Sequence, residues 1–139
     1  EQRLRMLELS IGDDPRFEAS RLELERDGLS FTVDTLDLLA KSTPGASLFM
    51  LIGEDLATQI ASWRDARRIA ELATIVVLVR ATVVTKSALE STLPMLRIPT
   101  RRIELSSTEI RDRVGAGRSI HGFVSDAVAA FIDAAGLYR

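Results

Sequence analysis

The sequence predicts an α/β fold with a mainly parallel sheet and helices on both faces. Two short runs, 48–52 and 75–79, are entirely apolar and are bounded by turn signals, which is typical of parallel strands covered by helices on either side. Amphipathic helical patterns alternate with these runs along the chain. Strand–helix alternation favours right-handed crossover connections between parallel strands. Ligands in such folds bind beyond the carboxyl ends of the strands, so we examine the residues that follow each strand.

Length and composition indicate one ordinary globular domain. The chain has 139 residues, of which 46% are hydrophobic and 27% charged, so residues 1–139 are expected to form a single domain with its own core. The formal net charge of −2 argues against a coat for nucleic acid or acidic membranes. The longest strongly apolar run is 75–79, whereas a membrane-spanning helix needs about 20 such residues. We therefore expect a cytoplasmic protein.

The chain has no cysteine and only one histidine. The lack of cysteine excludes disulfides, zinc–thiolate sites, iron–sulfur clusters and thiol nucleophiles. Because His121 is alone, no pair of histidines in this chain can hold a metal. It has no partner within reach in the local sequence, so we expect it to be structural or solvent-exposed.

The N-terminal part of the sequence predicts a helix and then a strand. Apolar residues with helical spacing start near residue 4, and the cluster 12–15 ends the helix. No capping residue precedes this helix, so we expect the chain to begin inside a fold. Alternating leucines and charged residues over 21–25 predict a half-exposed strand.

The middle of the sequence predicts a helix, a central strand, a helix and a second strand. Ser30 is placed to cap a helix that ends at 42–45. The run 48–52 is expected to be a central strand buried on both faces. A helix over 64–72 then leads to the strand 75–79.

The C-terminal part predicts three helices and a short strand. We expect a helix over 86–95, a strand over 102–105, a helix that begins at Ser106, and a last helix whose apolar face runs from 124 to 135. Gly136 is set to end that helix.

Two residues at the end of the run 48–52 could serve a nucleotide. Gly53 would let a ligand approach the backbone, and the carboxylate of Asp55 could accept hydrogen bonds from ribose hydroxyls. The alternative is an ordinary turn followed by a helix start.

The segment 106–111 has the spacing of a capping box, with Ser106 and Glu109 at a helix start. Free amides and the helix dipole suit a phosphate there, and Ser107, Thr108 and Arg111 add further donors. The alternative is a plain capped helix with Arg111 in solvent.

Trp63 is the only tryptophan, and it falls in a loop rather than on an apolar stripe. An indole in that position could stack on a planar ring, or it could belong to the core. Arg64 follows it, and Thr32 would by itself be assigned to the solvent-facing first turn of a helix.

Together, four segments resemble the bacterial nicotinate-nucleotide adenylyltransferases, which belong to the Rossmann-like nucleotidyltransferase α/β superfamily. The segments are Gly-Leu-Ser-Phe-Thr-Val-Asp-Thr-Leu at 28–36, Ile-Gly-Glu-Asp at 52–55 with Trp63 eight residues later, Leu-Ser-Ser-Thr-Glu-Ile-Arg at 105–111, and Gly-Leu-Tyr at 136–138. Phe31 stands where the family usually has a tyrosine.

The resemblance implies transfer of AMP from MgATP to nicotinate mononucleotide, which yields deamido-NAD and pyrophosphate. Such a transfer needs positioning and charge neutralisation rather than a protein nucleophile. By similarity, Thr32, Trp63 and Arg64 would bind the nicotinate. The residues that would bind ATP are Gly53, Asp55, Ser107, Thr108 and Arg111.

The family's His-x-Gly-His phosphate-binding segment has no counterpart in this sequence. We therefore expect the first strand–helix unit of the family to be missing before Glu1, so that the chain is N-terminally truncated and impaired in activity, and we assign it no catalytic residue or metal ligand.

Three alternatives remain open. The first is an adenylyltransferase for another acceptor, such as nicotinamide mononucleotide or phosphopantetheine. The second is a non-catalytic nucleotide-binding module, and the third is a flavodoxin-like binding domain. In each case the expected partners are small nucleotides rather than nucleic acid or membrane, and oligomeric state is left open.

Overall fold

The computed structural model describes residues 1–79, 93–101 and 103–139. The chain forms two compact units. One unit, Arg26–Arg102, contains the sheet, and we call it the sheet unit. The other combines Glu1–Glu25 with Ile103–Arg139, and we call it the helical unit because its regular elements are helices.

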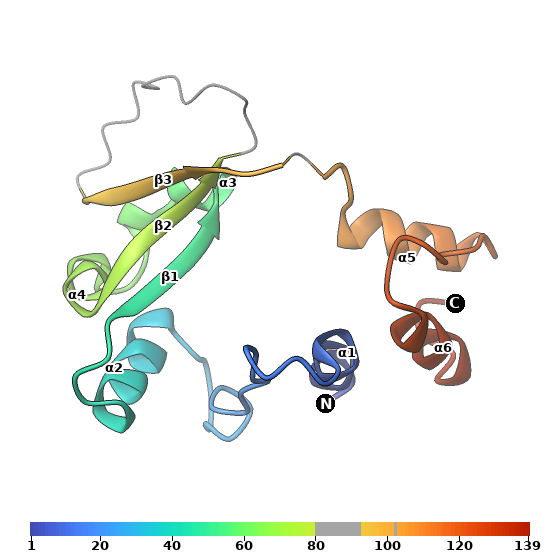
Figure 1. Cartoon of the computed structure of the whole chain (residues 1–139), viewed down its shortest axis with the longest axis horizontal. Helices are drawn as coiled ribbons and strands as arrows, with labels where there is room; N and C mark the ends of the chain where they lie inside the picture. The colour runs from blue at the N-terminus through green and yellow to red at the C-terminus, as the bar shows by residue number, and fades with distance from the viewer. Residues whose placement is uncertain (80–92, 102) are drawn as a thin grey trace. The chain divides into compact units, whose positions relative to one another are not determined.

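The sheet unit is built around three parallel strands in the order β1-β2-β3 (Figure 1). This arrangement confirms the predicted α/β class with a parallel sheet. In chain order the elements are α2 (Thr32–Ser42), β1 (Leu48–Gly53), α3 (Glu54–Ala57), the 3-10 turn η1 (Ile60–Ser62), α4 (Ala66–Leu72), β2 (Ala73–Val79) and β3 (Met95–Pro99).

The hydrophobic core cluster of the sheet unit lies on one face of the sheet, although Val76 on the other face of β2 is buried as well. Strand β2 is central, and alternate residues Ile75 and Val77 point into the core together with Ile52 of β1. Helix α2 contributes Val33 and Leu36. The largest side chains that are fully buried are Ile60, Ile69, Ile75 and Val77. The side chains of α2, η1 and α4 therefore pack against the same face of β2.

The opposite face of β1 is exposed, which contradicts the expectation for the run 48–52. Phe49 and Leu51 are 58% and 61% exposed, and β1 pairs only with β2 among the described strands. Leu96 and Ile98 of β3 are also exposed. In the register of the sheet they lie on the same face as Phe49 and Leu51. An unbroken apolar run indicates a strand but does not show whether both faces are covered.

The helical unit consists of α1 (Gln2–Ile11), α5 (Ser107–Gly115) and α6 (Asp126–Ala134). All three helices were predicted. The core of this unit combines Ile110 of α5 with Val128 and Ile132 of α6, and Met6 and Leu9 of α1 pack against it. The last helix is three residues shorter than the predicted range 124–135, since it begins at Asp126 and ends at Ala134.

Several predicted elements are wrong. Residues 21–25 form turns and bends, since their alternation meets no strand to pair with among the described residues. Helix α2 begins at Thr32, and its N-cap position is occupied by Phe31 rather than by Ser30. The third strand is not at 102–105: residues 103–105 have no regular structure, and the strand spans Met95–Pro99.

Part of the predicted helix over 86–95 lies outside the described residues. Its last residue, Met95, belongs to β3 and pairs with Ile75. Arg102, the first residue of the predicted strand, also lies outside them. In the parts of the chain that the structure describes, no helix is long and apolar enough to cross a membrane.

Removing a core side chain should distinguish the two faces of the sheet. Ile69 is fully buried, so Ile69→Ala is expected to lower the free energy of unfolding by about 2–5 kcal/mol. Ile98→Ala on the open face should cost less than about 1 kcal/mol. Urea unfolding followed by circular dichroism measures both, and equal losses would contradict a core that lies on one face.

Candidate nucleotide-binding site

A cavity of about 330 Å³ lies in the sheet unit beside the start of α2. The three residues predicted to bind the acceptor, Thr32, Trp63 and Arg64, all line it. Thr32 is about thirty residues away from the other two in the sequence. The remaining lining residues are Ser30, Phe31, Ser62 and Ile69.

Local backbone geometry presents these side chains to the cavity. Phe31 is extended at the N-cap of α2, and Trp63 is extended directly after η1, where its backbone N–H donates to the carbonyl of Ile60 at 3.0 Å. The next residue but one, Asp65, has a positive φ of 49° and redirects the chain into α4. Trp63 therefore lies in the short connection between η1 and α4, outside both elements.

Trp63 combines the two roles that its sequence context left open. It is half-buried and packs against the core of the sheet unit, as Phe31 also does. It lines the cavity as well. A ring so placed is held by the core and remains accessible to a planar ligand.

Arg64 is the charged residue among those that line the cavity, and it contacts a further charged group behind the wall. The guanidinium of Arg64 lies over the ring of Phe31, 4.6 Å from its centroid, and its Nη1 is 3.8 Å from Oδ2 of Asp34. The same carboxylate oxygen lies 4.0 Å from Nη1 of Arg26. Sequence reasoning missed Asp34 and Arg26, because an acidic residue in a first helical turn is ordinary and Arg26 lies in a turn with no periodic pattern.

Gly53 and Asp55 lie at the carboxyl end of β1, where α3 begins. Gly53 is the N-cap of α3, so the interpretation as a turn followed by a helix start describes the backbone. A Cβ at position 53 would lie 2.6 Å from the carboxylate oxygen Oδ1 of Asp55. A side chain at position 53 would require the exposed carboxylate of Asp55 to shift.

The start of α5 in the helical unit has the predicted capping geometry. The Ser106 hydroxyl accepts a hydrogen bond from the backbone N–H of Glu109 at 3.0 Å. Arg111 Nη2 donates to the hydroxyl of Thr108 at 3.2 Å, which brings these two predicted phosphate-binding residues together. Ser107, Thr108 and Arg111 are exposed.

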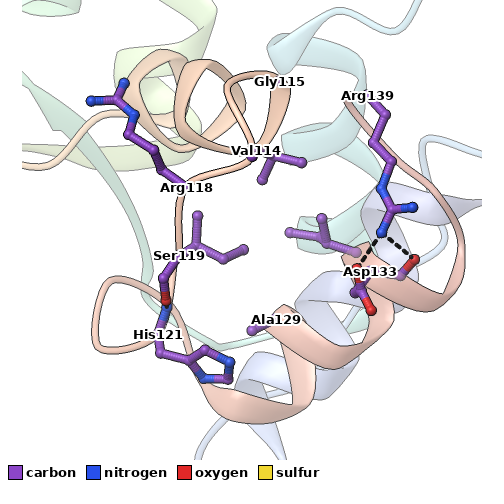
Figure 2. Close-up of a pocket in the computed structure, with 11 residues that line it drawn as sticks. Val114, Gly115, Arg118, Ser119, His121, Ala129, Asp133 and Arg139 are labelled. Atoms are coloured by element: carbon purple, nitrogen blue, oxygen red, sulfur yellow. Dashed lines mark hydrogen bonds and ion pairs between the residues drawn. The ribbon is translucent and has the colours of Figure 1, made fainter.

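A larger cavity, of about 660 Å³, lies between α5 and α6 and is lined by none of the predicted site residues (Figure 2). His121 is at its rim, 72% exposed, with Nδ1 3.2 Å from Oδ1 of Asp126. The expectation of an exposed histidine is confirmed, but the expectation that it lacks a local partner is wrong. Arg139 points to Asp133 and forms an ion pair with it (Figure 2).

Within the described ranges, no three side chains of His, Cys, Asp or Glu come together in a group that could hold a metal ion.

The capping bond of α5 gives a direct test of this helix start. Ser106→Ala should lower the free energy of unfolding by about 1 kcal/mol, because the amide of Glu109 loses its acceptor. Ser10→Ala on α1 is the matched control, since the Ser10 hydroxyl bonds only to the carbonyl of Met6 within its helix. Urea unfolding compares the two variants, and an equal effect would contradict a capping role.

Comparisons with known proteins identify the family to which the chain belongs. The family model described as Cytidylyltransferase-like matches residues 1–113. A nicotinate-nucleotide adenylyltransferase of Thermus thermophilus is 39% identical over 139 residues, which are 100% of this chain and 73% of the relative. One of Roseiflexus castenholzii is 41% identical over 99% of this chain and 71% of the relative.

Solved structures show the same fold. Nicotinic acid mononucleotide adenylyltransferase of Plasmodium falciparum, complexed with APC, superposes with a TM-score of 0.76 at 17% identity, over 99% of this chain and 74% of that one. The same enzyme complexed with NaAD gives a TM-score of 0.74 at 18% identity. By the extent of the family match and its identity to curated relatives, the chain belongs to the nicotinate-nucleotide adenylyltransferase family of cytidylyltransferase-like nucleotidyltransferases.

Proposed function

We propose that the chain carries the nucleotide-binding surfaces for transfer of AMP from MgATP to nicotinate mononucleotide, with deamido-NAD and pyrophosphate as products. The observation that carries the proposal is the cavity beside α2, which Thr32, Trp63 and Arg64 line together. Membership in the adenylyltransferase family supports the same reaction.

The cavity suits an aromatic ring that carries a negative charge. The indole of Trp63 offers a flat apolar surface for a pyridine ring. The guanidinium of Arg64 and the hydroxyl of Thr32 offer hydrogen-bond donors to a carboxylate. We therefore assign the nicotinate moiety to this cavity and its carboxylate to the polar side of the lining.

For ATP we propose two sets of residues, one in each unit. Gly53 and Asp55 at the end of β1 would contact the nucleoside, because a carboxylate accepts ribose hydroxyls and glycine admits a close ligand. The first turn of α5, with Ser107, Thr108 and Arg111, would bind the phosphates, since its free amides and guanidinium attract anions.

The chemistry needs no protein nucleophile. An oxygen of the acceptor's 5′-phosphate attacks the α-phosphorus of ATP, and the bond from that phosphorus to the β-phosphate bridging oxygen breaks, so pyrophosphate leaves with the electron pair. The protein's contribution is to hold both substrates in line and to neutralise charge on the leaving group. Mg²⁺ enters with ATP as part of the substrate.

We assign no catalytic side chain to this chain, because the His-x-Gly-His motif of the family has no counterpart in the sequence. Binding is therefore the property to measure. The proposed partners are small nucleotides, and a reaction that consumes ATP favours a cytoplasmic location.

Trp63 fluorescence tests the acceptor assignment. Saturable quenching by nicotinate mononucleotide, stronger than by nicotinamide mononucleotide, is expected because the carboxylate gains charge-assisted hydrogen bonds that the amide lacks. The titration should follow circular dichroism that establishes a folded chain. A preference for the amide, or for phosphopantetheine, would contradict nicotinate as the acceptor.

Replacing Arg111 tests the phosphate assignment. Arg111→Ala should weaken ATP binding by more than about 1 kcal/mol, because a charge-assisted hydrogen bond to phosphate is lost. Arg3→Ala, on the exposed surface of α1 in the same unit, is the control and should leave ATP affinity unchanged. Isothermal titration calorimetry with MgATP measures both, and equal affinities in the two variants would remove Arg111 from the site.

A further inference from the structure

Arg26 carries a guanidinium group that is largely buried. Its side chain is only 19% exposed, and both terminal nitrogens of the guanidinium are buried with no hydrogen-bond partner among the described residues. The nearest opposite charge is Asp34, with Nη1 and Oδ2 4.0 Å apart, longer than a hydrogen bond. A buried unsatisfied guanidinium is costly, so this one requires an explanation.

The contacts of Asp34 lead from Arg26 to the cavity. Asp34 lies in the first turn of α2, and its Oδ2 is shared between Arg26 and Arg64, the latter at 3.8 Å. Arg64 in turn lies over the ring of Phe31. Both Arg64 and Phe31 line the cavity, whereas Arg26 and Asp34 are not among its lining residues.

The burial of Arg26 distinguishes this network from ordinary surface ion pairs. Arg64 and Asp34 are both substantially exposed, and an exposed pair by itself orders side chains weakly. The buried guanidinium of Arg26 keeps the carboxylate nearby, because moving Asp34 away would leave a desolvated cation uncompensated. The carboxylate of Asp34 is thus attracted by the buried guanidinium of Arg26, and it can in turn attract the exposed guanidinium of Arg64.

We propose that Arg26 is a positioning residue for the acceptor cavity: through Asp34 it holds Arg64 over Phe31 and so sets the shape and charge of the cavity wall. The inference rests on the proposed function, since it concerns the cavity assigned to the nicotinate moiety. It makes Arg26 important for acceptor affinity without contact between Arg26 and the ligand.

The chain contains a matched control for this network. Arg68 on α4 pairs with Asp37 on α2 at 3.0 Å, and Asp37 lies three residues after Asp34 on the same helix. Neither Arg68 nor Asp37 lines the cavity. Both networks tie α2 to another segment through an arginine and an aspartate, but only one of them leads to the cavity wall.

The experiment measures the dissociation constant of nicotinate mononucleotide by Trp63 fluorescence in four variants. Arg26→Met and Asp34→Asn should each raise it by about fivefold or more, while Arg68→Met and Asp37→Asn should stay within about twofold of the unmodified chain. MgATP affinity, measured by calorimetry, should remain within about twofold in all four.

A conservative variant separates positioning from a merely structural role. Arg26→Lys keeps a buried positive charge beside Asp34, and because the pair is not bidentate we expect it to bind the mononucleotide within about twofold of the unmodified chain. If Arg26→Met instead weakens mononucleotide and MgATP to the same degree, the role of Arg26 is structural and the proposal is overturned.

The outcomes also separate this inference from the proposed function. No saturable quenching in the unmodified chain overturns the acceptor site and this inference together. Saturable quenching with equal affinities in Arg26→Met and Arg68→Met overturns the inference alone. If circular dichroism shows that Arg26→Met does not fold, Asp34→Asn decides, because that residue is the link between the buried cation and the wall.

Discussion

Burial of β2 between its two neighbours is the constraint on which the sheet unit depends. Ile75 and Val77 are almost completely buried, and the core residues of α2, η1 and α4 all meet this strand from one side. The strand therefore fixes the register of β1 and β3 as well as the position of the helices. Because so few large side chains are fully buried, each one carries a substantial part of the packing energy.

Helix α2 links that core to the cavity. Val33 and Leu36 pack inward, while Thr32 lines the cavity and Asp34 lies beside its wall, all within about one helical turn. The helical period thus places core and cavity residues at adjacent positions in the sequence. A shift of α2 against β2 would move Thr32 with it, so the position of this part of the cavity wall depends on the packing of the core.

Much of the architecture could be predicted because local patterns determine it. Parallel strands at 48–52 and 75–79 and the capped start of α5 follow from apolar runs and from one Ser-x-x-Glu spacing. The strand over 21–25 was wrong because alternation describes only a half-exposed surface, and a strand also needs a neighbour to pair with. The third strand was misplaced because its short stretch between two prolines has little pattern of its own.

The candidate site, like the fold, could be predicted only in part. Thr32, Trp63 and Arg64 could be grouped by their resemblance to a family, and they do line one cavity. Arg26 and Asp34 could not, because the role proposed for them depends on a contact between two residues eight positions apart and on the burial of two nitrogen atoms. Neither the contact nor the burial produces a periodic pattern in the sequence. Phosphate binding by Ser107, Thr108 and Arg111 likewise stays a prediction. The structure describes the local geometry of this helix start.

The open face of the sheet has a consequence for how the chain behaves in concentrated solution. Phe49, Leu51, Leu96 and Ile98 form an apolar surface, and β1 presents backbone groups that no described strand pairs with. Unpaired backbone groups of an edge strand beside exposed apolar side chains favour association with another chain. Salts that are excluded from protein surfaces strengthen apolar association, so colloidal stability should fall in sulfate or phosphate before any loss of native structure. These four side chains therefore add an apolar contribution to self-association that the net charge of the chain does not describe.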